Sequence, residues 1–336
     1  MVRMPAEWEP HEATWIGWPH NRSDWPGKIG AIHWVYAEIV RNLVPGEIVR
    51  ILVNSKKHEL LARKYLKKAG VPLDGVEFFR FPTNRSWTRD FGPLFVKKGK
   101  KNSIVDFGFN GWGRYPDFQK DNRIPAKVAK TLKKKILSVR HKNHPFVLEG
   151  GAIDGNGRGI LLTTEECQLD QVNQVRNPGV SRWEIESVLS DVLGIDLVLW
   201  LGKGIAGDDT HGHVDDLCRF VSPGSVVLCQ ESNSKDENYR PLQDNAHRLK
   251  HSGLEVIPLP MPNPLYFEEI RLPASYANFY ISNETVLVPT FNDPHDREAL
   301  GILSECFPDR SVVGIHSVDL VWGLGTIHCL TQQQPS

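Results

Sequence analysis

One order of elements recurs along the chain: an amphipathic helix, a short apolar strand, and two further strands joined by a turn. In its clearest copy, Ser181 and Glu184 have the spacing of a capping box, apolar residues follow at helical spacing, and Gly194 ends the helix. A buried strand is then expected at residues 196–201. The copy is completed by a predicted hairpin around Pro223-Gly224, at residues 214–221 and 225–229.

The same order is predicted in other parts of the chain. The further copies are helix 55–69, strand 76–81 and hairpin 94–97 with 103–107; helix 126–138, strand 146–148 and strands flanking 154–157; helix 242–251, strand 254–259 and hairpin 279–281 with 286–289; and helix 296–306, strand 311–315 and the segment up to Cys329. The helix at 29–43 and the strand at 48–53 stand apart and are candidates to close a ring.

A polar residue stands just before each predicted hairpin. Asp90, Glu149, His213, Asn278 and Cys329 follow one another at separations of 59, 64, 65 and 51 residues. A period near 60, with one polar residue at the same structural point of each unit, indicates pseudo-rotational repetition. Five units around an axis would direct these side chains at one central site. The sequence therefore predicts an α/β fold with a central functional site.

Cys329 is the candidate nucleophile. Gly323 and Gly325 precede it and polar residues follow it, which is an unusual place for a buried structural cysteine. The glycines would let the backbone bring the cysteine close to a substrate. A cysteine with a distant histidine and carboxylates, assembled only by folding, is typical of covalent catalysis. The remaining cysteines are expected to be structural: Cys167, Cys218, Cys229 and Cys306.

His213 is the candidate acid or base. His213 and Asp215 alternate on a strand-like segment and would face the same side, as a general acid/base beside a cation-binding carboxylate. A zinc site that includes His211 is the alternative, but neither HExxH nor paired CxxC is present, and no metal is expected. Asp90 and Glu149 have simpler interpretations as a local ion pair and a turn residue; their shared register with His213 favours the site.

The totals bear on the class of protein. The 336 residues include 40 basic and 40 acidic side chains, so the net charge favours neither nucleic acid nor an anionic membrane. Five widely spaced cysteines without CxxC indicate a reducing compartment. Neither a signal peptide nor an apolar run near the roughly 20 residues of a membrane span is visible. A cytoplasmic protein is expected; the length alone would fit one large domain or two ordinary ones.

Several motifs span the chain from about residue 5 to its end, and their order is highly specific. They are Glu9-Pro10-His11-Glu12-Ala13-Thr14-Trp15-Ile16-Gly17-Trp18-Pro19, Trp87-Thr88-Arg89-Asp90-Phe91-Gly92-Pro93, Leu148-Glu149-Gly150-Gly151, Leu161-Leu162-Thr163-Thr164-Glu165-Glu166-Cys167, Arg176-Asn177-Pro178, Gly212-His213-Val214-Asp215 and Ile327-His328-Cys329-Leu330-Thr331-Gln332-Gln333. Together they resemble the family of agmatine deiminases and bacterial-type peptidylarginine deiminases.

The resemblance implies the pentein fold, a five-bladed α/β propeller of ββαβ units, here as one catalytic domain over residues 1–336. It also implies roles: Cys329 attacks a guanidinium carbon, and Asp90 and Asp215 pair with the guanidinium nitrogens. His213 protonates the departing ammonia and then activates water against an amidino-cysteine intermediate, while Glu149 orients His213. Neither a metal nor an organic cofactor is required.

Two departures from the family pattern bear on the substrate. The usual Gly-Gly-Gly-Asn before Ile-His-Cys is Gly323-Leu324-Gly325-Thr326 here, and the usual Asp-Glu-Thr is Asp208-Asp209-Thr210. Agmatine ends in an amine, so its pocket needs a carboxylate, which Asp208 or Asp209 could supply. Trp87 either packs on the alkyl chain or belongs to the core, and Asn278 is a further candidate to bind substrate.

The leading hypothesis is therefore a hydrolase that converts agmatine to N-carbamoylputrescine and ammonia, a step toward putrescine in polyamine biosynthesis. The alternatives are a deiminase of peptidylarginine or another guanidino compound, an amidinotransferase that uses the same intermediate, and a non-catalytic guanidino-binding protein. The expected partner is a small cationic guanidino compound, with neither nucleic acid nor membrane. The assembly state is left open, with a homodimer as one alternative.

Overall fold

The structure is a computed structural model that describes residues 2–99 and 101–336. Its repeated feature is a sheet in which a hairpin is followed by a helix and a third strand. In one such sheet β13 (Cys218–Ser222) pairs antiparallel with β14 (Ser225–Gln230). After α7 (Tyr239–Leu249), β15 (Glu255–Pro260) runs parallel to β14. The strand after the helix thus belongs to the hairpin that precedes it in the chain.

The same connection builds three more sheets. They are β5 (Leu94–Lys98), β6 (Lys101–Asp106), α4 (Ile124–Leu132) and β7 (Lys135–Ser138); β10 (Asp154–Gly155), β11 (Ile160–Thr164), α6 (Arg182–Leu193) and β12 (Leu197–Leu201); and β18 (Tyr280–Ile281), β19 (Thr285–Thr290), α8 (Asp296–Cys306) and β20 (Ser311–His316). In each, the first two strands are antiparallel and the last two are parallel. β1 (Val2–Arg3) adds to the edge of the first.

A fifth sheet joins the two ends of the chain. β21 (Thr331–Pro335) pairs antiparallel with β2 (His11–Gly17), and β3 (Ile48–Leu52) and β4 (Val76–Phe79) continue the sheet in parallel. α1 (Ile29–Leu43) and α2 (Lys56–Lys68) make the two crossovers. The helix and strand that stood apart in the sequence therefore belong to the sheet that carries both ends.

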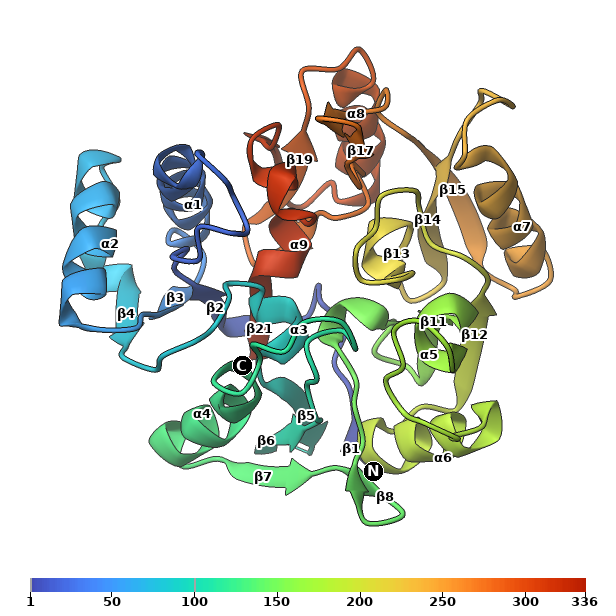
Figure 1. Ribbon diagram of the computed structural model, residues 1–336, viewed down its shortest axis with the longest axis horizontal. Coiled ribbons are helices and arrows are strands. Elements are labelled where there is room, and N and C mark those ends of the chain that lie inside the picture. Colours follow the sequence, from blue (N-terminus) through green and yellow to red (C-terminus); the bar gives the residue numbers. More distant parts are fainter. Residues whose placement is uncertain (1, 100) are drawn as a thin grey trace.

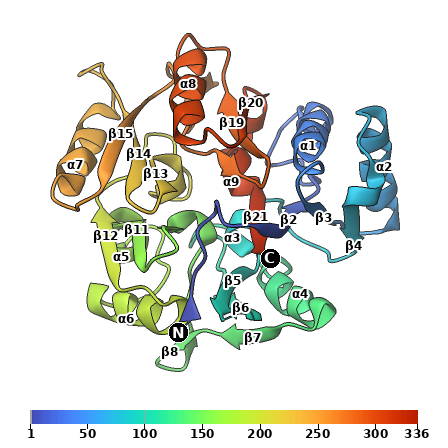
Figure 2. The same cartoon turned by 180° about the vertical axis from the view of Figure 1, so that it is seen from behind.

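The five sheets surround two short helices, α3 (Thr88–Phe91) and α9 (Ile327–Leu330), with the longer helices on the outside (Figure 1). Seen from behind, the N-terminal segment crosses the centre of the opposite face before it enters β2 (Figure 2). In four of these sheets an inner strand is largely buried, namely β2, β11, β14 and β19, and these strands supply much of the apolar core. Within the described parts of the chain, no helix combines the length and apolarity that crossing a bilayer would require.

Several predicted elements are confirmed by the structure. α1 and α8 have the expected bounds. Ser181 and Glu184 form the capping box of α6, and Gly194 ends that helix with φ 70°. Glycine suits this position because a positive φ costs it nothing sterically.

Some predictions about local structure are wrong. The helix expected at 126–138 ends at Leu132, because Lys133 takes a left-handed conformation with φ 52° and β7 follows. Residues 146–148 form no strand and contribute one isolated bridge, from Val147 to Gly108. The strand expected to be buried at 196–201 lies at a sheet edge, which leaves Leu197 46% exposed.

The remaining elements are short. They are α5 (Glu165–Leu169), β8 (Arg140–His141), β9 (His144–Pro145), β16 (Tyr266–Phe267), β17 (Ile270–Arg271) and the 3-10 helices η1 (Leu73–Gly75), η2 (Asp121–Arg123), η3 (Gly150–Ala152), η4 (Val214–Asp216) and η5 (Leu320–Gly323). The hairpin expected from residue 214 begins only at β13, since η4 takes the place of its first residues.

Candidate active site

The segments that directly precede β5, β10, β13, β18 and β21 converge at the centre of the molecule. Asp90 lies in α3, Cys329 lies in α9, and Glu149 comes directly before η3. His213 directly precedes η4, and Asn278 comes shortly before β18. α3 contacts both α9 and η3, and η3 contacts η4. The structure therefore brings together the residues that the spacing near 60 singled out.

Cys329 is buried among acidic side chains. Its thiol lies 3.7 Å from Asp215 Oδ2, as donor, and its Sγ accepts a hydrogen bond from Asn278 Nδ2 at 3.1 Å. Burial and the neighbouring carboxylates raise the pKa of this thiol well above its usual value. The thiol is therefore protonated in the free protein, and a cation beside it would favour the thiolate.

Asn278 holds the segment that carries the nucleophile. Its Oδ1 accepts hydrogen bonds from Thr326 Oγ1 at 2.8 Å and from the His328 backbone N–H at 3.0 Å. These bonds orient the amide so that Nδ2 donates to Asp216 Oδ1 at 2.8 Å as well as to Cys329 Sγ. Asn278 is predicted to bind substrate; in the structure its polar atoms are engaged by the protein, where they position the segment that carries Cys329.

Asp90 is held from both sides. Its Oδ1 accepts from the Gly151 backbone N–H at 3.0 Å, and its Oδ2 accepts from Trp112 Nε1 at 2.9 Å. A Cβ at Gly151 would lie 2.6 Å from His213 Nδ1 and 2.8 Å from Asp90 Oδ1, so only glycine fits there. Burial, helped by nearby carboxylates, raises the pKa of Asp90 to about 6.

Asp215 is supported from behind by His328. His328 Nδ1 lies 2.6 Å from Asp215 Oδ2, and His328 Nε2 lies 2.8 Å from Glu7 Oε2. Burial alone would raise the pKa of Asp215, but the bond and charge of His328 lower it below its usual value. Asp215 is therefore a carboxylate at neutral pH, and its Oδ1 has no partner within residues 2–99 and 101–336.

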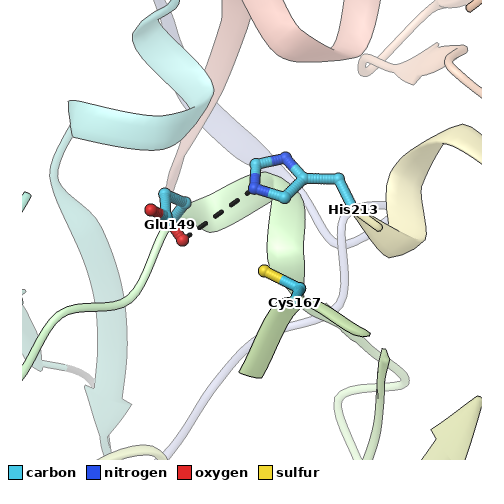
Figure 3. A group of neighbouring side chains, drawn as sticks. All are labelled: Glu149, Cys167 and His213. Carbon is cyan, nitrogen blue, oxygen red and sulfur yellow. Dashed lines mark ion pairs between the residues drawn. The ribbon is translucent and has the colours of Figure 1, made fainter. Parts of the chain in front are cut away.

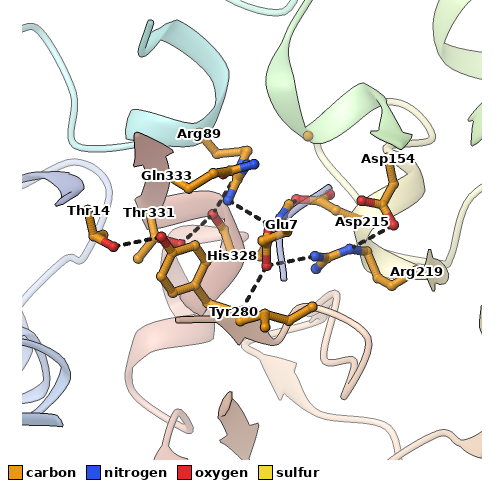
Figure 4. A network of polar contacts seen from close by, with 12 residues as sticks. Glu7, Thr14, Arg89, Asp154, Asp215, Arg219, Tyr280, His328, Thr331 and Gln333 are labelled. Atoms are coloured by element: carbon orange, nitrogen blue, oxygen red, sulfur yellow. Dashed lines mark hydrogen bonds and ion pairs between the residues drawn. The ribbon is translucent and has the colours of Figure 1, made fainter. Parts of the chain in front are cut away.

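Glu7 anchors this support and had no signal in the sequence. It accepts hydrogen bonds from Arg89 Nη2 at 3.1 Å and from Arg219 Nη2 at 3.0 Å, beneath His328 (Figure 4). Burial opposes ionisation, but Arg219, His328 and Arg89 together hold the pKa of Glu7 well below its usual range. Arg89, which the sequence paired with Asp90, pairs with Glu7 instead. His328 could have been found, because it stands within the Ile-His-Cys motif.

His213 lies between three carboxylates. Its Nδ1 is 3.8 Å from Asp90 Oδ1 and 3.9 Å from Asp215 Oδ1, and its Nε2 is 3.9 Å from Glu149 Oε2. Burial opposes the imidazolium, yet Asp90, Cys167 and Glu149 together raise the pKa of His213 well above its usual value. The histidine therefore starts protonated, as a proton donor requires. His213 and Asp215 come together across η4, whereas the sequence placed them on one face of a strand.

Glu149 is fixed by a buried arginine. Arg176 Nε donates to Glu149 Oε1 at 3.0 Å, and both side chains are fully buried. Burial would raise the pKa of Glu149, but Arg176 and His213 lower it to about 2. Glu149 therefore stays ionised and presents its second oxygen to His213.

A pocket opens above Cys329, with a cavity volume of about 160 Å³. Its walls combine aromatic side chains, carboxylates and the glycine-rich segment before the nucleophile. The lining residues are Ser23, Asp24, Arg85, Trp87, Asp90, Trp112, Tyr115, Asp209, Thr210, Trp322, Gly323, Leu324, Gly325 and Cys329. We call the part formed by Asp24, Arg85, Tyr115 and Asp209 the outer pocket.

The indole of Trp87 belongs to the core and also lines the pocket, so its packing on a substrate's alkyl chain stays a prediction. It is 5% exposed and packs on Trp25 with ring centroids 5.2 Å apart, and it also lines the pocket. A Cβ at Gly323 or Gly325 would lie within 2.9 Å of the Trp87 ring. These glycines therefore make room for the tryptophan in addition to shaping the approach to Cys329.

The adjacent aspartates Asp208 and Asp209 have different roles. Asp208 Oδ2 accepts from the backbone N–H groups of Gly212 at 2.7 Å and His213 at 2.9 Å, and Asp208 does not line the pocket. Asp208, predicted to bind substrate, instead fixes the loop before His213. Asp209 does line the pocket, where it accepts from Tyr115 Oη at 2.7 Å and pairs with Arg114 Nη1 at 2.6 Å.

The zinc site considered for the segment around His211 does not form. His211 Nε2 pairs with Asp170 Oδ2 at 2.9 Å, whereas His213 faces Asp90 and Glu149. The two histidines therefore have separate surroundings.

These features define a protein that binds a small cation next to a buried thiol and an imidazolium. The family model of Porphyromonas-type peptidyl-arginine deiminases matches residues 3–335, and the chain belongs to this family.

Within it, the chain is similar to agmatine deiminases. That of Pseudomonas aeruginosa (strain UCBPP-PA14) is 35% identical over 366 aligned positions, which cover 99% of this chain and 95% of that protein. That of Ectopseudomonas mendocina is 35% identical over 363 positions, with the same coverages.

Solved structures agree with this relationship. A substrate-bound structure of C. jejuni agmatine deiminase has a TM-score of 0.91 and 32% identity, covering 100% of this chain and 97% of that one. The agmatine deiminase of Enterococcus faecalis has a TM-score of 0.89 and 31% identity, covering 100% and 96%. An amidinotransferase from Microseira wollei, 14% identical with a TM-score of 0.54 over 99% and 96%, shares the fold alone.

Proposed function

We propose that this chain is an agmatine deiminase, a hydrolase that converts agmatine to N-carbamoylputrescine and ammonia. The observation that carries the proposal is that Cys329 and Asp90 line one pocket, with Asp215 Oδ2 3.7 Å from the Cys329 thiol. The full-length similarity to agmatine deiminases supports it.

The first step is binding of the guanidinium group. Asp90 and Asp215 accept hydrogen bonds from its nitrogens, for which the unpartnered Oδ1 of Asp215 is available. The bound positive charge lowers the cost of ionising the Cys329 thiol, whose proton leaves to the surrounding carboxylates or solvent. The substrate thus activates its own nucleophile, and neither a metal nor an organic cofactor takes part.

The covalent steps use Cys329 and His213. The thiolate attacks the guanidinium carbon, and the His213 imidazolium donates a proton to the departing nitrogen, which leaves as ammonia. An amidino-thioether remains on Cys329. Neutral His213 then takes a proton from water, the hydroxide attacks the same carbon, and Cys329 leaves as thiolate. Glu149, held by Arg176, stabilises the charged form of His213 in both steps.

The far end of the substrate selects agmatine over arginine. Asp209 and Asp24 in the outer pocket suit a terminal ammonium, and Trp87 offers an apolar face to the alkyl chain. The α-carboxylate of arginine would approach these same aspartates. Arg85 and Arg114 pair with these same two aspartates, so a terminal ammonium would share Asp24 with Arg85 and Asp209 with Arg114.

We further propose that the five sheets form a five-bladed propeller that acts as a single catalytic domain. The repeated hairpin–helix–strand order and the convergence of the preceding turns support this arrangement. A cytoplasmic location is supported by five cysteines that are all free thiols. A homodimer remains an expectation, which size-exclusion chromatography with light scattering would test.

One experiment separates the candidate reactions. The protein is incubated separately with agmatine, arginine and an arginyl peptide, and ammonia and ureido product are measured. Agmatine alone is expected to yield both in equal amounts. Turnover of another substrate without agmatine would refute the substrate assignment, and amidino transfer to an added amine would indicate a transferase.

A further inference from the structure

A second thiol faces the site from a side that the proposed reaction does not use. Cys167 lies in α5 and is fully buried, and its backbone N–H donates to Thr164 Oγ1 at 3.1 Å. Figure 3 shows Glu149, Cys167 and His213 converging from three different segments. Cys167 was expected to be structural, and this convergence indicates a more specific role.

The three side chains have the spacing of a metal site. Glu149 Oε2, Cys167 Sγ and a ring nitrogen of His213 all lie within 4.8 Å of one another, and His213 Nε2 is 3.9 Å from Glu149 Oε2. For atoms spaced in this way, some point lies no more than about 2.8 Å from all three. Zinc binds histidine nitrogen at about 2.0 Å and cysteine sulfur at about 2.3 Å. Side-chain shifts of up to about 0.8 Å would bring the three donors to these distances, and a water molecule would supply the fourth ligand.

Two of the three side chains present atoms that make no hydrogen bond within the described part of the chain. Glu149 Oε2 and both ring nitrogens of His213 have no hydrogen-bond partner among the described residues, although both side chains are fully buried. Such groups are unfavourable unless a ligand engages them. Arg176 fixes the other oxygen of Glu149, as an outer partner commonly does for a metal-binding carboxylate.

The donor set selects the kind of metal. One thiolate, one imidazole and one carboxylate suit Zn²⁺, whereas Mg²⁺ and Ca²⁺ prefer oxygen alone. We propose that Glu149 Oε2, Cys167 Sγ and His213 Nε2 form a site through which Zn²⁺ reversibly inhibits the enzyme. Binding releases the Cys167 thiol proton and the His213 imidazolium proton to solvent, and no electron is transferred. The inhibition rests on the proposed role of His213, because a zinc-bound ring nitrogen can neither donate nor accept the catalytic proton.

A neighbouring group of possible ligands fits less well. Asp215, Asp216 and Cys329 also present ligand atoms within 4.8 Å of one another. However, Asp215 Oδ2 is occupied by His328, and Asn278 Nδ2 donates to both Asp216 Oδ1 and Cys329 Sγ. Zinc would have to break these contacts. At the site around Cys167, Glu149 Oε2 and His213 Nε2 have no hydrogen-bond partner among the described residues, and Cys167 Sγ has a single one, Gln168 Nε2 at 3.7 Å.

Zinc affinity can be measured without activity, in Cys329→Ala protein that lacks the reactive thiol. Titration with Zn²⁺ against a fluorescent chelator is expected to show one ion per chain. Adding Cys167→Ala should weaken the binding at least about tenfold. Adding Cys306→Ala instead should leave it unchanged, because Cys306 lies in α8, away from His213. Equal affinities in all three proteins would overturn the proposal.

Two further readouts keep the result interpretable. If Cys167→Ala does not fold, Cys167→Ser with Co²⁺ as the probe replaces it, and loss of the thiolate-to-cobalt absorption is expected. Retention of that absorption in the Cys329→Ala/Cys167→Ser protein would contradict the assignment. In the protein with Cys329 intact, Zn²⁺ should inhibit agmatine turnover and a chelator should restore it. Zinc bound at Cys167 without inhibition would refute the role of His213 while leaving the site itself intact.

Discussion

The buried centre around Cys329 and the outer pocket differ in whether their charged groups are already paired within the protein. At the centre, Asp215 Oδ1, Glu149 Oε2 and the ring nitrogens of His213 have no hydrogen-bond partner among the residues that the structure describes. In the outer pocket, Asp209 is already paired with Arg114, and Arg85 is paired with Asp24. The centre thus has hydrogen-bond acceptors free for a bound cation, whereas the carboxylates of the outer pocket are already paired with arginines. Changes at the centre should affect the chemistry, and changes outside it should affect the choice of substrate.

The largest effect tests the centre itself. Cys329→Ala should lower agmatine turnover by about 10⁴-fold or more, because it removes the atom that forms the intermediate. Initial rates of ammonia release measure the loss, and thermal unfolding checks the fold. Cys306→Ala, which removes a thiol from α8, is the matched control and should retain activity. Full activity in Cys329→Ala would refute the nucleophile.

Two neighbouring aspartates sharpen the comparison within the centre. Asp215→Asn should lower kcat/KM by roughly 10²–10³-fold, because it removes a charge that pairs with the guanidinium. Asp216→Asn should change it little, since burial and adjacent carboxylates raise the pKa of Asp216 well above its usual value and leave it neutral. Steady-state kinetics on both variants provide the test, and equal losses would contradict the distinct roles.

The pH profile tests the charge on Asp90. The pKa of Asp90 is about 6, so kcat/KM should fall about tenfold per pH unit below that value as the carboxylate becomes protonated. The folded pKa exceeds the ordinary value of 3.8. The free energy of unfolding therefore falls as pH rises from about 4 to 6, because the carboxyl ionises in the unfolded chain before it ionises in the folded protein. Above pH 6 the full loss is present. Asp90→Asn should raise the free energy of unfolding at pH 7 by on the order of 1–3 kcal/mol while losing activity.

Chemical denaturation at pH 7 and at pH 4 provides the control for that prediction. The stabilisation by Asp90→Asn should shrink at pH 4, where the carboxyl is protonated in the folded protein. A variant that is equally stabilised at both pH values would contradict the assignment of the raised pKa.

The smallest effect tests the outer pocket. Asp209→Asn should raise KM for agmatine about tenfold, equivalent to about 1.4 kcal/mol, with little change in kcat. Butylguanidine, which lacks the terminal amine, is the matched substrate and should be affected much less. A fall in kcat for both substrates would show that Asp209 acts on the centre rather than on the tail of the substrate.

Local patterns predicted the elements and their order well. The bounds of α1 and α8 and the caps of α6 follow from residues close in sequence, since helix periodicity and capping are local properties. Lys133 shows where helix periodicity fails as a guide. The helical spacing of apolar residues continues beyond it, but its left-handed backbone ends the helix. The edge position of Leu197 depends on strand order, which periodicity does not encode.

The residues of the candidate site could be predicted where they occupy the same position in each repeated unit. Asp90, Glu149, His213 and Cys329 each stand at the same point of a unit, so spacing alone grouped them. Glu7 belongs to no repeat, and its partner His328 lies 321 residues further along the chain. The separate places of Asp208 and Asp209 arise from loop hydrogen bonds, which residue type does not reveal.

The pairing of β2 with β21 also bears on how the protein folds. Trp15 in β2 bonds to Gln334 in β21, 319 residues away, and α9 with the nucleophile lies directly before that strand. Contacts that span nearly a whole chain form slowly, because a large loop must close first. During refolding, secondary structure would return before Cys329 meets its partners. Recovered enzymatic activity therefore reports the pairing of β2 with β21, whereas circular dichroism reports only the earlier return of secondary structure.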